Sequence, residues 1–284
     1  MTLQRAPRIC VIGWPIKHSR SPLIHNRWLK QYGLDGSYEK HEVRPEHLAT
    51  FIQSLREGSF AGCNVTIPHK ENIGELVDEI DPVTKPAGSS NTLHMEAGIL
   101  KATSTDGEGF YQNLMAHQPG HNIAKLPIVI LGAGGSARAI AHGLVLKGAS
   151  RIFIHNRNPD RAKALAHMLG KPLVAITSDQ LPDTLQQAGT LINTTSAGLT
   201  DNDNLQIPWH HLHPQAVVAD IVYTPLVTAF LEAARRHGHP VVPGLGMLLH
   251  QAVVGFEKWF GVRPEVTQEL YDLVARDIDP DFKP

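Results

Sequence analysis

Two residues far apart in the sequence, Lys70 and Asp106, carry charges suited to acid–base chemistry. Lys70 closes the segment 64–70, which reads NVTIPHK, and Asp106 lies in the segment 103–107, which reads TSTDG. Hydride transfer to a ketone builds negative charge on oxygen, and a neighbouring ammonium can stabilise that charge and protonate the oxygen. In the oxidative direction the neutral amine can take the hydroxyl proton. We therefore expect Lys70 to be the acid/base and Asp106 to orient it; the alternative is a surface ion pair of little energetic value.

A glycine-rich loop downstream of this pair predicts a dinucleotide cofactor. Gly132-x-Gly134-x-x-Ala137 follows the apolar run 127–131 and opens a helical segment, the context that the dinucleotide fingerprint requires. Gly132 would permit a tight turn, Gly134 the approach of the pyrophosphate to the backbone, and Ala137 close helix–strand packing. The anion would then rest on free amides at the positive end of the helix.

The end of the next predicted strand favours NADP over NAD. A carboxylate here would accept a hydrogen bond from the ribose 2′-hydroxyl of NAD, but the chain carries Asn156 and Arg157, with Arg161 one helical turn later. Guanidinium groups pair with phosphate through charge-assisted hydrogen bonds, so the sequence predicts a 2′-phosphate. The alternative is that the arginines are solvated. Asp160 opposes the prediction unless its carboxylate points away from the phosphate.

Further polar side chains cluster at predicted strand ends in the N-terminal half. Ser19 and Ser21 lie between the first strand and the first helix, where two hydroxyls and a helix N-terminus suit a small carboxylate. The alternative is that Ser21 only caps the helix, followed by Pro22 at the first helical position. Thr66, Asn91 and Thr105 also lie at or just beyond strand ends, as do Lys70 and Asp106. Ligands of open α/β sheets bind at the carboxyl ends of the strands, so this clustering favours a substrate site.

The elements that must hold these residues alternate between short apolar runs and helix-like segments. In the N-terminal half we expect strands over 8–12, 37–43, 61–66, 92–95 and 99–102, the last two forming a hairpin, and helices over 21–31 and 45–56. In the C-terminal half we expect strands over 128–131, 151–155, 172–176, 190–193, 216–220 and 240–242, and helices over 137–146, 160–169, 226–237, 246–260 and 264–278. This rhythm predicts an α/β fold of two α/β domains, an N-terminal substrate domain and a Rossmann-like doubly wound parallel sheet.

Composition excludes several classes of partner. The 284 residues carry a formal net charge of -1, so no basic field predicts nucleic acid or a membrane surface. No apolar run approaches the roughly 20 residues of a membrane span, and the first residues lack the apolar core of a signal peptide. Cys10 and Cys63 give neither a disulfide framework nor metal-ligand spacing, and we expect small buried side chains. We therefore expect a cytoplasmic monomer or homodimer without a metal.

The clusters described above resemble the shikimate dehydrogenases, members of the shikimate/quinate dehydrogenase family, from Gly13 to about Trp259. Nine blocks in order carry the resemblance. The blocks of the N-terminal half are Gly13-x-Pro15-Ile16-x-His18-Ser19-x-Ser21-Pro22, Asn64-Val65-Thr66-x-Pro68-x-Lys70, Asn91-Thr92 and Thr105-Asp106-Gly107-x-Gly109. Those of the C-terminal half are Gly132-Ala133-Gly134-Gly135, Asn156-Arg157, Asn193-x-Thr195-x-x-Gly198, Asp220-x-x-Tyr223-x-Pro225 and Gly244-x-Gly246-Met247-Leu248-x-x-Gln251.

The resemblance implies reversible NADPH-dependent reduction of 3-dehydroshikimate to shikimate, a late step toward chorismate and the aromatic amino acids. It implies that Lys70 is the catalytic acid/base and Asp106 its substrate-binding partner. The implied substrate residues are Ser19, Ser21 and Tyr223 for the carboxylate, and Thr66, Asn91 and Gln251 around the ring hydroxyls. The implied cofactor residues are Gly132, Ala133, Gly134, Gly135 and Ser136 for the pyrophosphate, Asn156, Arg157, Asn158 and Arg161 for the adenosine 2′-phosphate, and Ile221 and Gly244 beside the nicotinamide.

The pattern of elements and the resemblance together predict the domain limits and leave some alternatives open. The pattern of elements divides the chain near residues 106–120, so we expect a substrate-binding and catalytic domain over 1–106 and an NADP-binding domain over 107–243. The resemblance implies that C-terminal helices over 244–284 return to the first domain. Ser104, the pair Ser89-Ser90 and Asn158 depart from the usual family residues without removing a proposed contact. A dehydrogenase that also takes quinate, and uses NAD, is the close alternative. A non-catalytic sensor is disfavoured by the presence of Lys70 and Asp106, and a tetrahydrofolate dehydrogenase-like enzyme by the serine motif and the 64–70 block.

Overall fold

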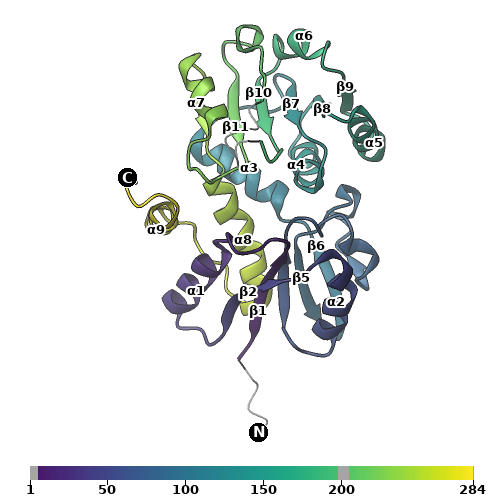
Figure 1. The fold of residues 1–284 in the computed structure, drawn as a ribbon, viewed down its shortest axis with the longest axis vertical. Coiled ribbons are helices and arrows are strands. Elements are labelled where there is room, and N and C mark those ends of the chain that lie inside the picture. The colour runs from purple at the N-terminus through teal and green to yellow at the C-terminus, as the bar shows by residue number, and fades with distance from the viewer. Residues whose placement is uncertain (1–5, 198–204, 284) are drawn as a thin grey trace. The chain divides into compact units, whose positions relative to one another are not determined.

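The computed structural model describes residues 6–197 and 205–283, and the chain divides into two compact units (Figure 1). Unit 1 comprises Met1–Thr105 and Gln251–Val274, and unit 2 comprises Asp106–His250 and Ala275–Pro284. Each unit carries its own six-stranded sheet. No helix within the described ranges is long and apolar enough to cross a membrane.

The sheet of unit 1 is mixed, in the order β2-β1-β3-β5-β6-β4. Its strands are β1 (Arg8–Gly13), β2 (Ser37–Glu42), β3 (Gly62–Val65), β4 (Glu79–Ile80), β5 (Thr92–Glu96) and β6 (Ile99–Thr103). The predicted hairpin is confirmed: β5 and β6 pair antiparallel across a two-residue turn in which Ala97 and Gly98 both have positive φ, 51° and 81°. The short strand β4, which pairs in parallel with β6, was not predicted, since two residues give no periodicity.

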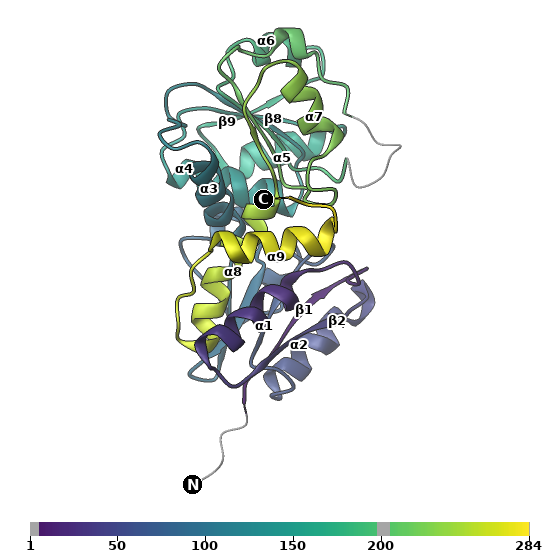
Figure 2. The same ribbon diagram turned by 90° about the vertical axis from the view of Figure 1, so that its left-hand side faces the viewer.

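Helices cover both faces of the parallel part of this sheet. Helix α1 (Ser21–Tyr32) and helix α2 (Leu48–Arg56) lie on opposite faces of β1 and β2 (Figure 2). Alternate residues of β1 therefore enter different cores: Cys10 packs in the cluster that contains α2, and Ile9 packs with Tyr38 and with Trp259 of helix α8. Both cysteines are buried free thiols on adjacent strands, as predicted.

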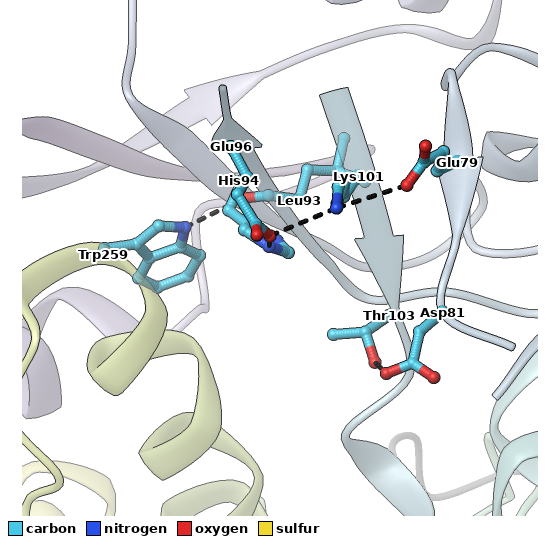
Figure 3. Close-up of polar contacts among 8 residues, drawn as sticks. All are labelled: Glu79, Asp81, Leu93, His94, Glu96, Lys101, Thr103 and Trp259. Atoms are coloured by element: carbon cyan, nitrogen blue, oxygen red, sulfur yellow. Dashed lines mark hydrogen bonds and ion pairs between the residues drawn. The ribbon is translucent and has the colours of Figure 1, made fainter. Parts of the chain in front are cut away.

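Lys101 of β6 forms ion pairs with β4 and β5, and α8 contacts the backbone of β5 (Figure 3). Lys101 Nζ lies 3.2 Å from Glu79 Oε2 and 3.4 Å from Glu96 Oε2. The indole N–H of Trp259 donates to the Leu93 carbonyl oxygen at 2.9 Å. This bond fastens the C-terminal part of α8 to the sheet of unit 1.

Unit 2 is the predicted doubly wound sheet, with all strands parallel in the order β12-β11-β10-β7-β8-β9. Its strands are β7 (Ile128–Leu131), β8 (Ile152–His155), β9 (Leu173–Ile176), β10 (Thr190–Asn193), β11 (Val217–Asp220) and β12 (Val241–Val242). Its helices are α3 (Asp106–His117), α4 (Gly135–Leu146), α5 (Pro159–Leu169), α6 (Leu181–Leu185) and α7 (Ala229–Arg236). Ile128 and Ile130 of β7 enter one core and Val129 and Leu131 the other, so the central strand is buried on both faces.

Two long helices follow β12, α8 (Leu245–Phe260) and α9 (Gln268–Ile278). Several predicted bounds were too long. The helix predicted over 45–56 begins as a short 3₁₀ turn, Pro45–His47, and the one predicted over 226–237 begins only at Ala229. The cause of the second difference is Thr228, whose side chain accepts a hydrogen bond from the Leu231 N–H and caps the helix there. Residues 198–204, including Gly198 of the family block, lie outside the described residues.

Candidate active site

A buried polar hub in unit 1 joins the predicted site residues Asn91 and Gln251. Asn91 Nδ2 donates to Thr105 Oγ1 at 2.9 Å and to Gln251 Oε1 at 3.1 Å, and Asn91 Oδ1 accepts from the Thr105 N–H at 2.8 Å. All three residues are buried. The hub thus brings together the start of β5, the end of β6 and helix α8. Thr105, which the sequence placed in the same strand-end cluster without a specific contact, also belongs to this hub.

The segment that carries Lys70 is anchored on both sides. The adjacent His69 is fully buried, and its Nε2 lies 2.8 Å from the Val43 carbonyl oxygen. The Ser90 N–H donates to the Lys70 carbonyl at 3.0 Å. Lys70 itself is half-buried at the end of this turn. A half-buried ammonium on a fixed backbone can meet a ligand while its stem stays packed.

Thr66, at the end of β3, lies against Gly13, at the end of β1. A Cβ at Gly13 would come within 2.5 Å of Thr66 Cγ2, so only glycine fits this approach. The backbone N–H of Thr66 donates to the Ile12 carbonyl at 2.9 Å. The half-buried Thr66 side chain is therefore held at the carboxyl end of the parallel strands, as the sequence predicted for a site residue.

Of the predicted serine pair, Ser21 does not cap helix α1. Ser21 is not the N-cap of α1: Arg20 occupies that position, no side chain caps it, and Ser21 is the buried first residue of the helix. The interpretation of Ser21 as the helix cap was wrong, because the chain becomes helical one residue earlier than the Ser-Pro pattern implies. The Ser21 N–H instead donates to Ser19 Oγ at 3.3 Å, which draws the two serines together.

Two residues that carry no predicted role, Tyr38 and Asn64, connect the serines to the hub. The Tyr38 hydroxyl donates to Asn64 Oδ1 at 2.6 Å, and Asn64 Nδ2 donates to the Asn91 carbonyl oxygen at 3.0 Å. Burial raises the pKa of Tyr38 well above its ordinary value, and a hydrogen bond with Ser21 opposes that rise. The phenol therefore stays neutral. Asn64 was visible in a family block; Tyr38 gave no sequence signal.

Asp106 is the first residue of α3 and belongs to unit 2, whereas Lys70 belongs to unit 1. The Asp106 side chain is 3% exposed. The next residue fixes the start of its helix: a Cβ on Gly107 would lie 2.5 Å from the Ala139 carbonyl oxygen of α4, so α3 and α4 approach closely at this point. That Lys70 and Asp106 act together stays a prediction.

The glycine loop of unit 2 has the form expected of a phosphate cradle. Gly132 has a φ of +114°, and a Cβ there would lie 2.5 Å from Thr194 Oγ1. Gly134 is the N-cap of α4, and helix residues begin at Gly135. Ala133 is buried and Ser136 half-buried. No side chain makes a capping hydrogen bond to the N-terminal amides of this twelve-residue helix, and such amides fit a pyrophosphate.

The residues predicted for the adenosine end surround the start of α5. Arg157 and Arg161 are exposed, and Arg161 Nη2 donates to the Ala133 carbonyl at 3.4 Å, which places it beside the glycine loop. Asn158 Oδ1 accepts from the Asp160 N–H at 3.0 Å, so this oxygen caps α5. Asn156 Nδ2 donates to the Asn158 carbonyl at 2.8 Å.

The Asp160 carboxylate, which would repel a 2′-phosphate, forms an ion pair with a lysine. Its Oδ1 lies 3.4 Å from Lys163 Nζ on the exposed side of α5. This ion pair offsets part of the repulsion that Asp160 would exert on a 2′-phosphate, and Arg157 and Arg161 carry charge of the sign that such a group requires.

The remaining predicted cofactor residues meet at the end of β11. Gly244 lies against the Ile221 backbone so closely that a Cβ on Gly244 would come within 2.6 Å of the Ile221 carbonyl. Tyr223 is half-buried in the same turn. The residue before the turn, Asp220, is buried, and desolvation raises its pKa from 3.8 to about 6, with hydrogen bonds from Thr228, Val222 and Asn193 opposing the rise. No group of three or more metal-binding side chains occurs in the parts of the chain that the structure describes.

Comparisons with known proteins agree with this arrangement. Residues 11–93 match the shikimate dehydrogenase substrate binding domain, residues 114–221 match shikimate / quinate 5-dehydrogenase, and residues 244–268 match the shikimate 5′-dehydrogenase C-terminal domain. The chain is 49% identical over 278 residues to the shikimate dehydrogenase (NADP(+)) of Rhizobium etli, covering 96% of both chains.

Solved structures agree as well. The chain resembles the Thermus thermophilus shikimate 5-dehydrogenase in complex with NADP(H) and shikimate with a TM-score of 0.85 and 34% identity, over 96% of this chain and 99% of that one. A quinate dehydrogenase from Corynebacterium glutamicum in complex with NAD also matches, with a TM-score of 0.85 and 26% identity, over 95% and 98% of the two chains. The chain described here therefore belongs to the shikimate dehydrogenase family.

Proposed function

We propose that this chain catalyses the reversible NADPH-dependent reduction of 3-dehydroshikimate to shikimate, the step that leads toward chorismate and the aromatic amino acids. The observation that carries the proposal is the 49% identity, over 96% of both chains, to a relative named for this activity and for NADP(+). The hub of Asn91, Thr105 and Gln251 supports it independently. It is a set of neutral amides and a hydroxyl at the ends of β5 and β6, which suits a ligand with several hydroxyl groups.

Lys70 is the acid/base of the proposed reaction. NADPH supplies a hydride to the ketone carbon when it is bound. The oxygen then carries developing negative charge, and Lys70 donates the proton that makes it a hydroxyl. In the opposite direction the neutral amine of Lys70 accepts that proton. Asp106 accepts a hydrogen bond from the neighbouring hydroxyl and orients the ammonium.

The other site residues bind and orient the two ligands. Ser19, Ser21 and Tyr223 hold the substrate carboxylate, while Thr66, Asn91 and Gln251 surround the ring hydroxyls. The loop from Gly132 to Ser136, which also contains Ala133, Gly134 and Gly135, binds the pyrophosphate. Asn156, Arg157, Asn158 and Arg161 surround the adenosine 2′-phosphate, with Asn158 acting also as the cap of α5. Ile221 and Gly244 lie beside the nicotinamide.

The two units divide these tasks in the proposal. Unit 1, the N-terminal substrate-binding and catalytic domain, receives the C-terminal part of α8 with Gln251, and unit 2 is the NADP-binding domain. We propose a cytoplasmic monomer or homodimer that binds no nucleic acid, on the near-zero net charge of -1 and the two free thiols.

Steady-state assays with two acids and two cofactors test the proposal. Shikimate with NADP should give the highest kcat/KM, because the two arginines near the glycine loop favour a 2′-phosphate. The match to an NAD-bound quinate dehydrogenase makes quinate with NAD the proper competitor. A kcat/KM for quinate equal to that for shikimate, or a preference for NAD, would overturn the proposed specificity.

A further inference from the structure

Asp220, at the end of β11, is a buried carboxylate that accepts three hydrogen bonds from three different parts of unit 2. Its Oδ1 accepts from the Val222 N–H at 2.9 Å and from Asn193 Nδ2 at 3.0 Å. Its Oδ2 accepts from the Thr228 hydroxyl at 2.7 Å. The residue is 2% exposed. Burial of a carboxylate is costly unless its oxygens are hydrogen-bonded, and here both oxygens are.

The donors connect the turn after β11 to its surroundings. Asn193 ends the adjacent strand β10, and Thr228 caps α7 through the Leu231 N–H. Asn193 is itself held, because its Oδ1 accepts from the Thr195 N–H at 3.0 Å and from the Thr195 hydroxyl at 2.7 Å. The Val222 N–H lies inside the turn. Asp220 therefore ties the turn 221–223 to one strand and one helix.

The same turn is held from its other side by Gly244. Gly244 packs on the Ile221 backbone, and the carbonyl of the preceding Pro243 accepts from Asn113 Nδ2 of α3 at 2.8 Å. Asn113 is 1% exposed, so this contact is also in the interior. Ile221 is thus confined between the Asp220 carboxylate and a segment fixed by α3.

We propose that Asp220 is a positioning residue, which sets the place of the nicotinamide ring and of Tyr223 by fixing the turn 221–223 through Val222, Asn193 and Thr228. The inference rests on the proposed function, which puts Ile221 and Gly244 beside the nicotinamide. Asp220 touches neither ligand in this account. Its removal should leave the pyrophosphate cradle, at the start of α4, in place.

The test compares Asp220→Ala, the conservative Asp220→Asn and the control Asp183→Ala, an exposed carboxylate of α6. Three quantities are measured below the melting temperature of each variant: kcat for shikimate oxidation, the dissociation constant of NADPH alone by fluorescence, and hydrogen exchange of the 221–223 amides. Misplacement of a reacting group by about 1 Å can cost roughly 100-fold in rate. We expect kcat of Asp220→Ala to fall by about 10- to 100-fold.

The other two readouts separate positioning from a general loss of structure. The dissociation constant of NADPH should change by less than about threefold, since its phosphates bind elsewhere in the unit. Exchange of the Val222 amide should accelerate, because its acceptor is gone. Asp220→Asn keeps an acceptor for Val222 and should recover most of the lost kcat. The control should match the wild type in all three.

Several outcomes would overturn the inference. A wild-type kcat in Asp220→Ala would do so, as would a loss of NADPH affinity in proportion to the loss of kcat. If Asp220→Ala does not fold, Thr228→Val decides, because it removes one donor to Asp220 at nearly constant shape. It also removes the N-cap of α7, so a lower stability alone does not count; unchanged kcat and unchanged Val222 exchange would contradict the proposal. If the wild type does not oxidise shikimate with NADP, the proposed function fails, and unchanged Val222 exchange in Asp220→Ala would separately overturn the positioning role.

Discussion

The two units bury polar groups in different ways. In unit 1 the hub of Asn91, Thr105 and Gln251 consists of neutral amides and hydroxyls. In unit 2 the corresponding buried network is built around a carboxylate, Asp220. A neutral hub can exchange its hydrogen bonds with the hydroxyl groups of a ligand at little electrostatic cost. A carboxylate whose two oxygens are already hydrogen-bonded fixes the backbone around it instead, because charge-assisted hydrogen bonds are stronger than those between neutral groups.

Whereas both oxygens of the buried Asp220 carboxylate are hydrogen-bonded, unit 1 contains a buried histidine whose ring nitrogens have no hydrogen-bond partner among the described residues. Neither ring nitrogen of His25 has one among the described residues, and the side chain is fully buried. It stacks on Tyr38, with ring centroids 4.1 Å apart and an interplanar angle of 3°. Burial lowers the pKa of His25 from 6.5 to about 3. As the pH falls, His25 should therefore lower the free energy of unfolding of unit 1, and Asp220 should raise that of unit 2.

Replacement of His25 by Phe should remove the larger of the two pH-dependent changes in the free energy of unfolding. Unfolded His25 takes up a proton near pH 6.5, and the folded residue does so only near pH 3. Between these values the unfolded state binds more protons, so the free energy of unfolding falls as the pH falls. At about 1.4 kcal/mol per pKa unit, the loss approaches roughly 5 kcal/mol over the full interval, of which about 3 kcal/mol falls between pH 7 and pH 4. Hydrogen exchange of unit 1 peptides between pH 7 and pH 4 measures it.

The control for His25→Phe is the surface variant His47→Phe, whose side chain is exposed. His25→Phe should keep the exchange protection of unit 1 at pH 4 that the wild type and the control lose. If all three proteins lose protection equally, then His25 does not govern the acid response of this unit.

Replacement of Asp220 by Asn should remove a smaller response of opposite sign. Folded Asp220 holds its proton up to about pH 6 and the unfolded residue only to about 3.8. Between these values the folded state binds more protons, so the stability from this group is complete below pH 3.8 and is lost as the pH rises through 6. The difference is roughly 3 kcal/mol. Exchange of unit 2 peptides in the wild type, in Asp220→Asn and in the exposed control Asp183→Asn measures it. An identical pH dependence in all three would break the comparison.

Replacement of Arg157 by Ala should have the smallest effect of the three, because the side chain is exposed and salt screens it. We expect the ratio of kcat/KM for NADP to that for NAD to fall about tenfold, or roughly 1.4 kcal/mol. Arg151→Ala is the control: that exposed guanidinium lies over the Phe153 ring at the start of β8. A ratio that is unchanged by Arg157→Ala, or lowered equally by the control, would remove Arg157 from the 2′-phosphate site.

Much of the fold followed from local patterns, and the errors have physical causes. The strands of unit 2 were predicted within one residue at each end, because each is a short apolar run and the inner strands are buried on both faces. Strand β4 and the short helix α6 were missed, since two and five residues are too few to show periodicity. The twelve-residue helix α3 was missed as well, because Gly107 and Gly109 in its first turn weaken the helical pattern. The start of α7 was placed too early because the cap at Thr228 depends on a hydrogen bond, which spacing does not reveal.

The residue types of the candidate site could be predicted from the sequence, but the hydrogen bonds between them could not. Asn91 and Gln251 are 160 positions apart, and only the fold shows that they are hydrogen-bonded. Tyr38 lies in a strand of ordinary appearance, and its contact with Asn64 depends on the pairing of β1 with both neighbours. Asp220 stands in a family block of the sequence, but only the structure shows that its carboxylate accepts hydrogen bonds from three donors.

The central claim, that Lys70 is the acid/base, is tested most directly by kcat of Lys70→Ala alongside the dissociation constant of NADPH. Loss of a general acid/base costs about 10²- to 10⁴-fold in kcat. We predict a loss in that range with NADPH affinity unchanged, since the proposed cofactor residues lie in unit 2, and no change in the control Lys30→Ala, an exposed residue of α1. A kcat for Lys70→Ala equal to that of the wild type would contradict the account.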